Sequence, residues 1–133
     1  MNAIRAKVEG IRSDPYFTIV SLGINGETRL RTLKTEIPAW LGVGDTVECH
    51  IQEASLSICK GRHDGDVSIE NRIEGRVSEI LKGDVLSELT FETPCGSLKS
   101  LVTTDACERM AMETGEDVTL LLKAVDIKLH PIL

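Results

Sequence analysis

Aromatic residues are scarce in this chain, whose 133 residues include one Trp, one Tyr and two Phe. Proteins that bind single-stranded nucleic acids stack successive bases on aromatic side chains and line the strand's path with positive charge. The formal net charge here is −6, so the chain lacks an excess of basic residues as well as aromatic side chains. We therefore expect no nucleic-acid partner.

Long hydrophobic runs are missing too. No apolar segment approaches the roughly 20 residues that a membrane-spanning helix needs. The charged opening, MNAIRAKVEG, lacks the apolar core of a secretory signal. We expect a cytoplasmic protein with no membrane partner.

The chain has four cysteines but no C-x-x-C pair, which argues against a structural zinc site. Cys49 alternates with Val47 and Ile51, as a core-facing residue of a strand would. In a cytosolic protein such thiols stay reduced. The sequence therefore predicts free cysteines and no metal site.

Signatures of catalysis are also absent. The chain has no phosphate-binding motif of the form G-x-x-x-x-G-K-[ST], and no nucleophile–base pair or paired carboxylate set stands out. We expect a binding protein and not an enzyme.

What the sequence does contain is an internal repeat. Gly44-Asp45-Thr46-Val47 aligns with Gly115-Glu116-Asp117-Val118, and Asn2 near the start aligns with Asn71. The first spacing is 71 positions and the second is 69, so we expect two extra residues in the second copy, within 81–96. The spacing of 71 also matches Thr32 with Thr103. This predicts one repeat over 1–60, a polar linker over 61–67 and a second repeat over 68–133.

Each repeat has the pattern of short strands. In the second, alternating or β-rich segments at 73–80, 86–92, 97–103, 118–123 and 127–129 surround a short helix predicted over 104–110. The first repeat has Asn25-Gly26 as a hairpin turn and a short predicted helix that carries Pro38. Five strands with one helical turn are typical of a small Greek-key barrel. We therefore predict a mainly all-β chain of two tandem OB-like barrels, each with one short helix.

Four motifs of the second repeat resemble one known family. Residues 68–77, SIENRIEGRV, resemble the S-x-R-N-x-[LI]-x-G-x-V opening of Mop (TOBE) domains, and Val102-Thr103-Thr104 resembles the I-T-x before the family's short helix. Residues 112–118, METGEDV, resemble L-x-x-G-x-x-V, and 122–127, LKAVDI, resemble the closing I-K-A-x-D-V. The motifs follow the family's order across the whole second repeat.

The resemblance implies a function as well as a fold. Stand-alone tandem Mop proteins are small cytoplasmic binders of molybdate or tungstate. Their Mop units assemble in rings of six, and the anions lie at interfaces between units. The resemblance thus implies storage or homeostasis of such an oxyanion by a homotrimer of this chain.

The same resemblance suggests the residues of an oxyanion site. Ser68, Asn71, Thr103 and Lys123 match the family's serine, asparagine, hydroxyl donor and lysine, and Thr32 is the matching hydroxyl of the first repeat. The family's arginine falls at Glu70, whose carboxylate would repel a dianion unless it points away.

The departure at Glu70 keeps an alternative open. In this reading the chain is a ligand-free TOBE-type regulatory or interaction module associated with a molybdate transporter ATPase or a regulator. Arg29 and Arg31 alternate on a predicted strand, and we expect them to form a solvent-exposed face and not a second anion site.

Overall fold

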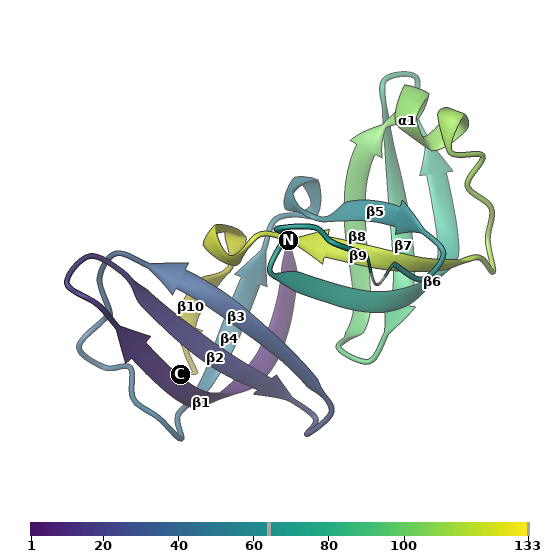
Figure 1. The fold of residues 1–133 in the computed structure, drawn as a ribbon. Helices are drawn as coiled ribbons and strands as arrows, with labels where there is room; N and C mark the ends of the chain where they lie inside the picture. The colour runs from purple at the N-terminus through teal and green to yellow at the C-terminus, as the bar shows by residue number, and fades with distance from the viewer. Residues whose placement is uncertain (64, 133) are drawn as a thin grey trace.

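The protein's structure is a computed structural model that describes residues 1–63 and 65–132. In these residues ten strands form two five-stranded antiparallel sheets (Figure 1). The first sheet contains β1 (Asn2–Ser13), β2 (Thr18–Ile24), β3 (Thr28–Lys34), β4 (Thr46–Ile51) and β10 (Lys128–Pro131). The second contains β5 (Ser57–Lys60), β6 (Asn71–Lys82), β7 (Leu86–Thr93), β8 (Gly96–Thr103) and β9 (Asp117–Leu122). Helical turns are α1 (Thr104–Arg109) and the 3-10 segments η1 (Glu53–Ser55) and η2 (Ala124–Asp126).

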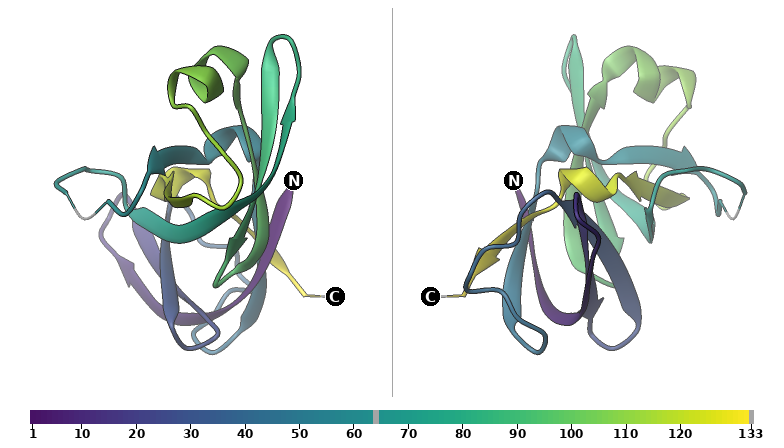
Figure 2. Two further views of the ribbon diagram at one scale, coloured as in Figure 1. Left: turned by 90° about the vertical axis from the view of Figure 1, so that its right-hand side faces the viewer. Right: turned by 60° about the vertical axis from the view of Figure 1, so that its left-hand side comes forward.

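The two sheets exchange their last strands. Strand β5 follows β4 in the chain but pairs with β9, so that Cys59 lies opposite Thr119. Strand β10 ends the second repeat but pairs with β4 in the first sheet, where Leu129 lies opposite Cys49. Figure 2 shows the C-terminal strand leaving the second sheet and running beside the first. The predicted division of the sequence between 60 and 68 therefore does not divide the sheets.

Alternation of apolar and polar residues explains why these segments are strands. Along β2 every second residue is buried, and the buried face includes Val20 and Leu22, both with 0% exposure. A β-bulge interrupts β1 at Val8–Gly10, and another interrupts β6 at Val77–Glu79. Bulges bend and twist a strand, which curls each sheet around its own apolar side chains. The predicted mainly-β class with two OB-like units is confirmed.

The predicted helices have different outcomes. In the second repeat α1 forms, and its first turn is capped by the hydroxyl of Thr103, which accepts a hydrogen bond from the Ala106 N–H at 3.0 Å. In the first repeat the helix expected around Pro38 is replaced by turns over residues 35–43, all of which the structure describes. Proline donates no N–H and disfavours helical geometry in the residue before it.

A difference in connection length explains this asymmetry and corrects the sequence alignment. The β2–β3 loop has three residues (25–27), and the β7–β8 loop has two (94–95). The next connection has 11 residues in the first repeat (35–45) and 13 in the second (104–116). The extra residues thus lie around α1 and not within 81–96. As a result Thr32 occupies the position in the first sheet that Ser100, and not Thr103, occupies in the second.

The contact between the repeats has a pseudo-twofold pattern. Asn2 donates to the Lys99 carbonyl at 2.8 Å and accepts from the Lys99 N–H at 2.8 Å. Asn71 donates to the Arg31 carbonyl at 2.9 Å and accepts from the Arg31 N–H at 2.7 Å. Each asparagine is buried and pairs with the edge strand of the other repeat as a backbone unit would.

No helix within residues 1–63 and 65–132 is long and apolar enough to cross a membrane. Residue 64 of the predicted linker and residue 133 at the end of the second repeat lie outside the described residues.

Candidate functional site

A cavity of about 360 Å³ lies between the two repeats. One wall comes from β2 and β3 of the first repeat. The other comes from the segment before β6 and from the start of η2, both in the second repeat. Its lining consists of Ile19, Arg31, Leu33, Ser68, Ile69, Glu70, Lys123, Ala124 and Val125. Two residues predicted for the oxyanion site, Ser68 and Lys123, therefore meet in one cavity.

Ser68 and Lys123 both have polar groups available to a ligand. Ser68 is exposed in the segment that leads into β6. Lys123 is exposed and has extended backbone angles, φ −68° and ψ 145°, immediately before η2. Among the described residues, neither the Ser68 hydroxyl nor the Lys123 ammonium has a hydrogen-bond or ion-pair partner. The cavity thus holds one hydroxyl donor and one cation whose donors are not already used within the described chain.

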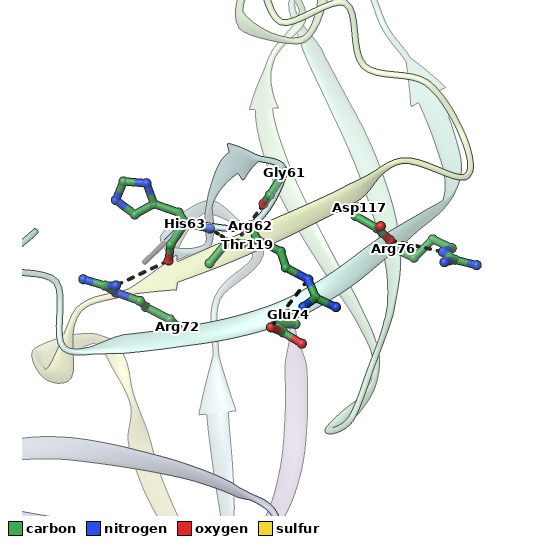
Figure 3. A network of polar contacts seen from close by, with 8 residues as sticks. All are labelled: Gly61, Arg62, His63, Arg72, Glu74, Arg76, Asp117 and Thr119. Carbon is green, nitrogen blue, oxygen red and sulfur yellow. Dashed lines mark hydrogen bonds and ion pairs between the residues drawn. The ribbon is translucent and has the colours of Figure 1, made fainter. Parts of the chain in front are cut away.

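The segment before Ser68 is held by a polar network on the outer face of β6 and β9 (Figure 3). The His63 N–H donates to the Thr119 hydroxyl at 3.0 Å, and that hydroxyl donates to the Gly61 carbonyl at 2.9 Å. The Arg72 guanidinium donates to the carbonyls of His63 at 3.3 Å and Gly65 at 2.7 Å. These contacts hold Gly61, His63 and Gly65 against β6 and β9.

Arg31 is the residue of this cavity that the sequence reasoning missed. The sequence predicts a solvent-exposed face for Arg31, and 55% of its side chain is exposed. The same face of the strand also forms part of the cavity wall. The guanidinium lies 3.4 Å from the carboxylate of Glu70, whose side chain is 40% exposed. Glu70 therefore faces the cavity with a cation beside it.

Asn71, also predicted for the site, does not line this cavity. Its side chain is only 2% exposed, and both ends of its amide are used by the backbone of Arg31. It lines an adjoining polar hollow of about 670 Å³. The Asn71 side chain thus holds β3 against the start of β6.

The two predicted threonines lie elsewhere. Thr103 is at the end of β8, where it caps α1, and in Figure 1 α1 stands far from η2. Thr32 has 0% exposure, and its hydroxyl donates to the carbonyls of Ala124 at 3.1 Å and Ile127 at 3.0 Å. Thr32 therefore packs the two repeats together and has no surface for a ligand, because its match with Thr103 depended on the wrong alignment.

The charged residues of the cavity lining have a positive balance. Lys123 and Arg31 bring two positive charges and Glu70 brings one negative charge, so the local balance is positive although the whole chain is acidic. No group of three or more His, Cys, Asp or Glu residues that could hold a metal ion occurs within the part of the chain that the structure describes.

Comparison with known proteins identifies the second repeat. Residues 67–129 match the model of the TOBE domain. Molybdenum-pterin-binding proteins 1 and 2 of Clostridium pasteurianum are 26% and 27% identical over 62 residues, which cover 46% of this chain and 91% of each relative. The crystal structure of ModG, a cytoplasmic molybdate-binding protein, in a molybdate-bound form superposes with a TM-score of 0.90 and 21% identity.

That superposition covers 98% of this chain and 96% of ModG, so the likeness of fold extends over both repeats. The family match covers the second repeat, where the sequence motifs also lie. Residues 67–129 thus match the TOBE domain, and the second repeat is similar in sequence to the molybdenum-pterin-binding proteins.

Proposed function

We propose that this chain binds a tetrahedral oxyanion, molybdate or tungstate, in the cavity between its repeats and stores it in the cytoplasm. The observation that carries this proposal is the meeting of Ser68 and Lys123 in one cavity with their donor groups unused among the described residues. The names of its relatives point to the same ligand class, since they are described as molybdenum-pterin-binding and molybdate-binding proteins.

The chemistry of the ligand matches these residues. Molybdate is a dianion whose four oxygens accept hydrogen bonds, so a site needs converging donors and a modest positive charge. A serine hydroxyl and a lysine ammonium are donors of the required kind, and the ammonium adds charge. Storage is a binding equilibrium, so the site needs no nucleophile and no general base.

We further propose that the chain acts as a homotrimer in which a second copy completes each site. Thr103, the remaining hydroxyl of the family pattern, is exposed and lies too far along the second sheet to serve the cavity of its own chain. Beside it lie Val85 and Leu86, which are 75% and 52% exposed, and Leu86 is the register partner of Thr103. An apolar tip of this kind on one copy suits the apolar residues Ile19 and Leu33 in the cavity wall of another.

Isothermal titration calorimetry with molybdate, tungstate and sulfate tests the binding proposal. We expect saturable binding of molybdate or tungstate, and at least tenfold weaker binding in Lys123→Gln and in Ser68→Ala. Lys128→Gln is the matched control, because Lys128 is an exposed lysine on β10 that does not line the cavity. Absence of binding heat with all three anions would overturn the proposal and favour the ligand-free interaction module.

Sedimentation equilibrium tests the assembly. The proposal expects a mass three times the 14.6 kDa of one chain, with the trimer weakened when Val85 and Leu86 are both changed to Ser. A monomeric mass at all concentrations, with or without anion, would contradict the homotrimer.

A further inference from the structure

We infer that Arg31, from the first repeat, is the second cation of the oxyanion site and that Glu70 competes with the anion for it. This inference rests on the proposed function of the cavity, and it concerns which residues set the affinity there. Both repeats then contribute residues to the site, because Ser68 and Lys123 belong to the second repeat and Arg31 belongs to the first.

Arg31 is firmly held at its backbone and free at its tip. Its N–H and its carbonyl both bond to the buried side chain of Asn71, at 2.7 and 2.9 Å. Its guanidinium, in contrast, is more than half exposed and has one weak partner, the Glu70 carboxylate at 3.4 Å. The backbone therefore places Arg31 at the cavity wall, while the side chain can change partners.

An oxyanion is the better partner for that guanidinium. Ion pairs between exposed side chains contribute little because water screens them and the side chains lose freedom. A guanidinium presents two parallel N–H donors that match two oxygens of a tetrahedral dianion, and a dianion attracts it more strongly than a single carboxylate does. On binding, Arg31 would leave Glu70 and donate to the anion beside Lys123.

Glu70 then lowers the affinity in two ways. It holds the guanidinium in the empty site, so this pair must separate before Arg31 can bind the anion. It also stays at the rim of the cavity as a negative charge that repels a dianion. Removing the charge of Glu70 without changing its shape should therefore strengthen binding.

The neighbouring Arg29 provides a matched control. It lies on the same face of β3, two residues from Arg31, and pairs with Glu9 at 3.0 Å in the same manner. It is 70% exposed and lines the adjoining polar hollow, but it does not line the cavity that contains Ser68 and Lys123. Loss of Arg29 therefore removes the same charge and a similar ion pair without touching the site.

The experiment is calorimetric titration of the full chain with sodium molybdate at fixed ionic strength. We expect Arg31→Gln to weaken binding at least tenfold, Arg31→Lys to weaken it less because the charge remains, and Arg29→Gln to stay within about twofold of the wild type. Glu70→Gln should bind several times more tightly than the wild type. Urea midpoints of all variants verify that each is folded.

Three outcomes overturn the inference. If the wild type and Arg29→Gln bind and Arg31→Gln binds equally well, Arg31 has no part in the site, although the proposed function stands. If Glu70→Gln binds more weakly than the wild type, Glu70 supports the site instead of competing with the anion. If the wild type does not bind at all, the proposed function fails together with this inference.

Discussion

Asn2 and Asn71 stand 69 positions apart in the sequence and make the same pair of hydrogen bonds across the boundary between the repeats. Each side chain accepts from an N–H and donates to the carbonyl of one residue, Lys99 for Asn2 and Arg31 for Asn71. The edge strands β8 and β3 are thereby tied to the opposite repeat. The second of these ties also fixes the backbone of Arg31 at the wall of the candidate site.

Replacing either asparagine should destabilise the protein. Asn71→Ala and Asn2→Ala each remove two hydrogen bonds from partly buried backbone groups, which would lose about 2 kcal/mol of unfolding free energy. Urea unfolding followed by circular dichroism measures this loss. Ser78→Ala, which removes an exposed hydrogen bond to the Thr90 carbonyl, should change the unfolding free energy by less than about 0.5 kcal/mol. If the asparagine variants lose no more unfolding free energy than Ser78→Ala, the asparagine hydrogen bonds between the repeats do not stabilise the protein.

The strand exchange predicts that both repeats unfold together. Each sheet needs a strand from the other repeat, β10 in the first sheet and β5 in the second, so neither keeps five strands alone. Trp40, the one tryptophan of the chain, lies in the first repeat and reports on that half. Its fluorescence and the far-ultraviolet circular dichroism should therefore give the same urea midpoint.

A variant in the second repeat makes this test stricter. Leu120 on β9 is fully buried, and Leu120→Ala should cost about 2–5 kcal/mol of unfolding free energy through lost packing. Because the repeats are interlocked, the Trp40 signal should shift to the same lower midpoint. If the Trp40 transition stays at the wild-type midpoint, the two halves unfold independently and the account of the fold is wrong.

How much of this fold could be predicted from the sequence depends on the range of the interaction. Alternation along the strands, the hairpin turn at Asn25-Gly26 and α1 are local patterns, and they identify the elements correctly. The exchange of β5 and β10 is not local, because a short strand such as Ser57–Lys60 has the same alternation whichever sheet it joins. The alignment error at Thr32 also comes from features that are not local. The loops before and after β3 differ in length from those around β8, so the two repeats align at both ends while β3 is matched to β8 three positions out of register.

The candidate site was predictable only in part. Ser68 and Lys123 stand in motifs of the second repeat, so the resemblance finds them and the structure brings them into one cavity. Arg31 belongs to no motif, and a strand face that lines a cavity has the same polar alternation as one that faces solvent. Only the packing of one repeat on the other places this arginine near Lys123.

The buried thiol of Cys49 gives a pH dependence of defined sign. Burial, with a smaller effect of Cys95, raises the pKa of Cys49 from 9.0 to about 12. Above pH 9 the unfolded chain loses this proton while the folded protein keeps it, so stability falls as pH rises. The contribution lost between pH 8 and pH 10 is about 1.4 kcal/mol.

Urea unfolding of the wild type and of Cys49→Ala over this pH range isolates the effect of the thiol. The difference in unfolding free energy between the two proteins should shrink by the stated amount as the pH rises from 8 to 10. A difference that is constant across this range would mean that the folded thiol ionises as readily as the unfolded one.

Thr32 provides a test that separates structure from binding. Thr32→Val removes a buried hydroxyl that donates to η2 and to the Ile127 carbonyl, and should cost about 1–2 kcal/mol of unfolding free energy. Ser100→Ala, which removes the corresponding donor to the Leu56 carbonyl, should have a similar effect. Molybdate affinity measured by calorimetry should stay within about twofold of the wild type in both. A tenfold loss of molybdate affinity in Thr32→Val alone would mean that Thr32 contributes to the anion site.

The central claim is the location of the anion, and anomalous diffraction from crystals grown with tungstate tests it most directly. The account predicts a tungsten peak in the cavity between the repeats, within hydrogen-bond distance of Ser68 and Lys123. Arg31 should be turned towards that peak and away from Glu70. A tungsten peak at any other place on the protein, or crystals with no ordered tungsten, would contradict the account.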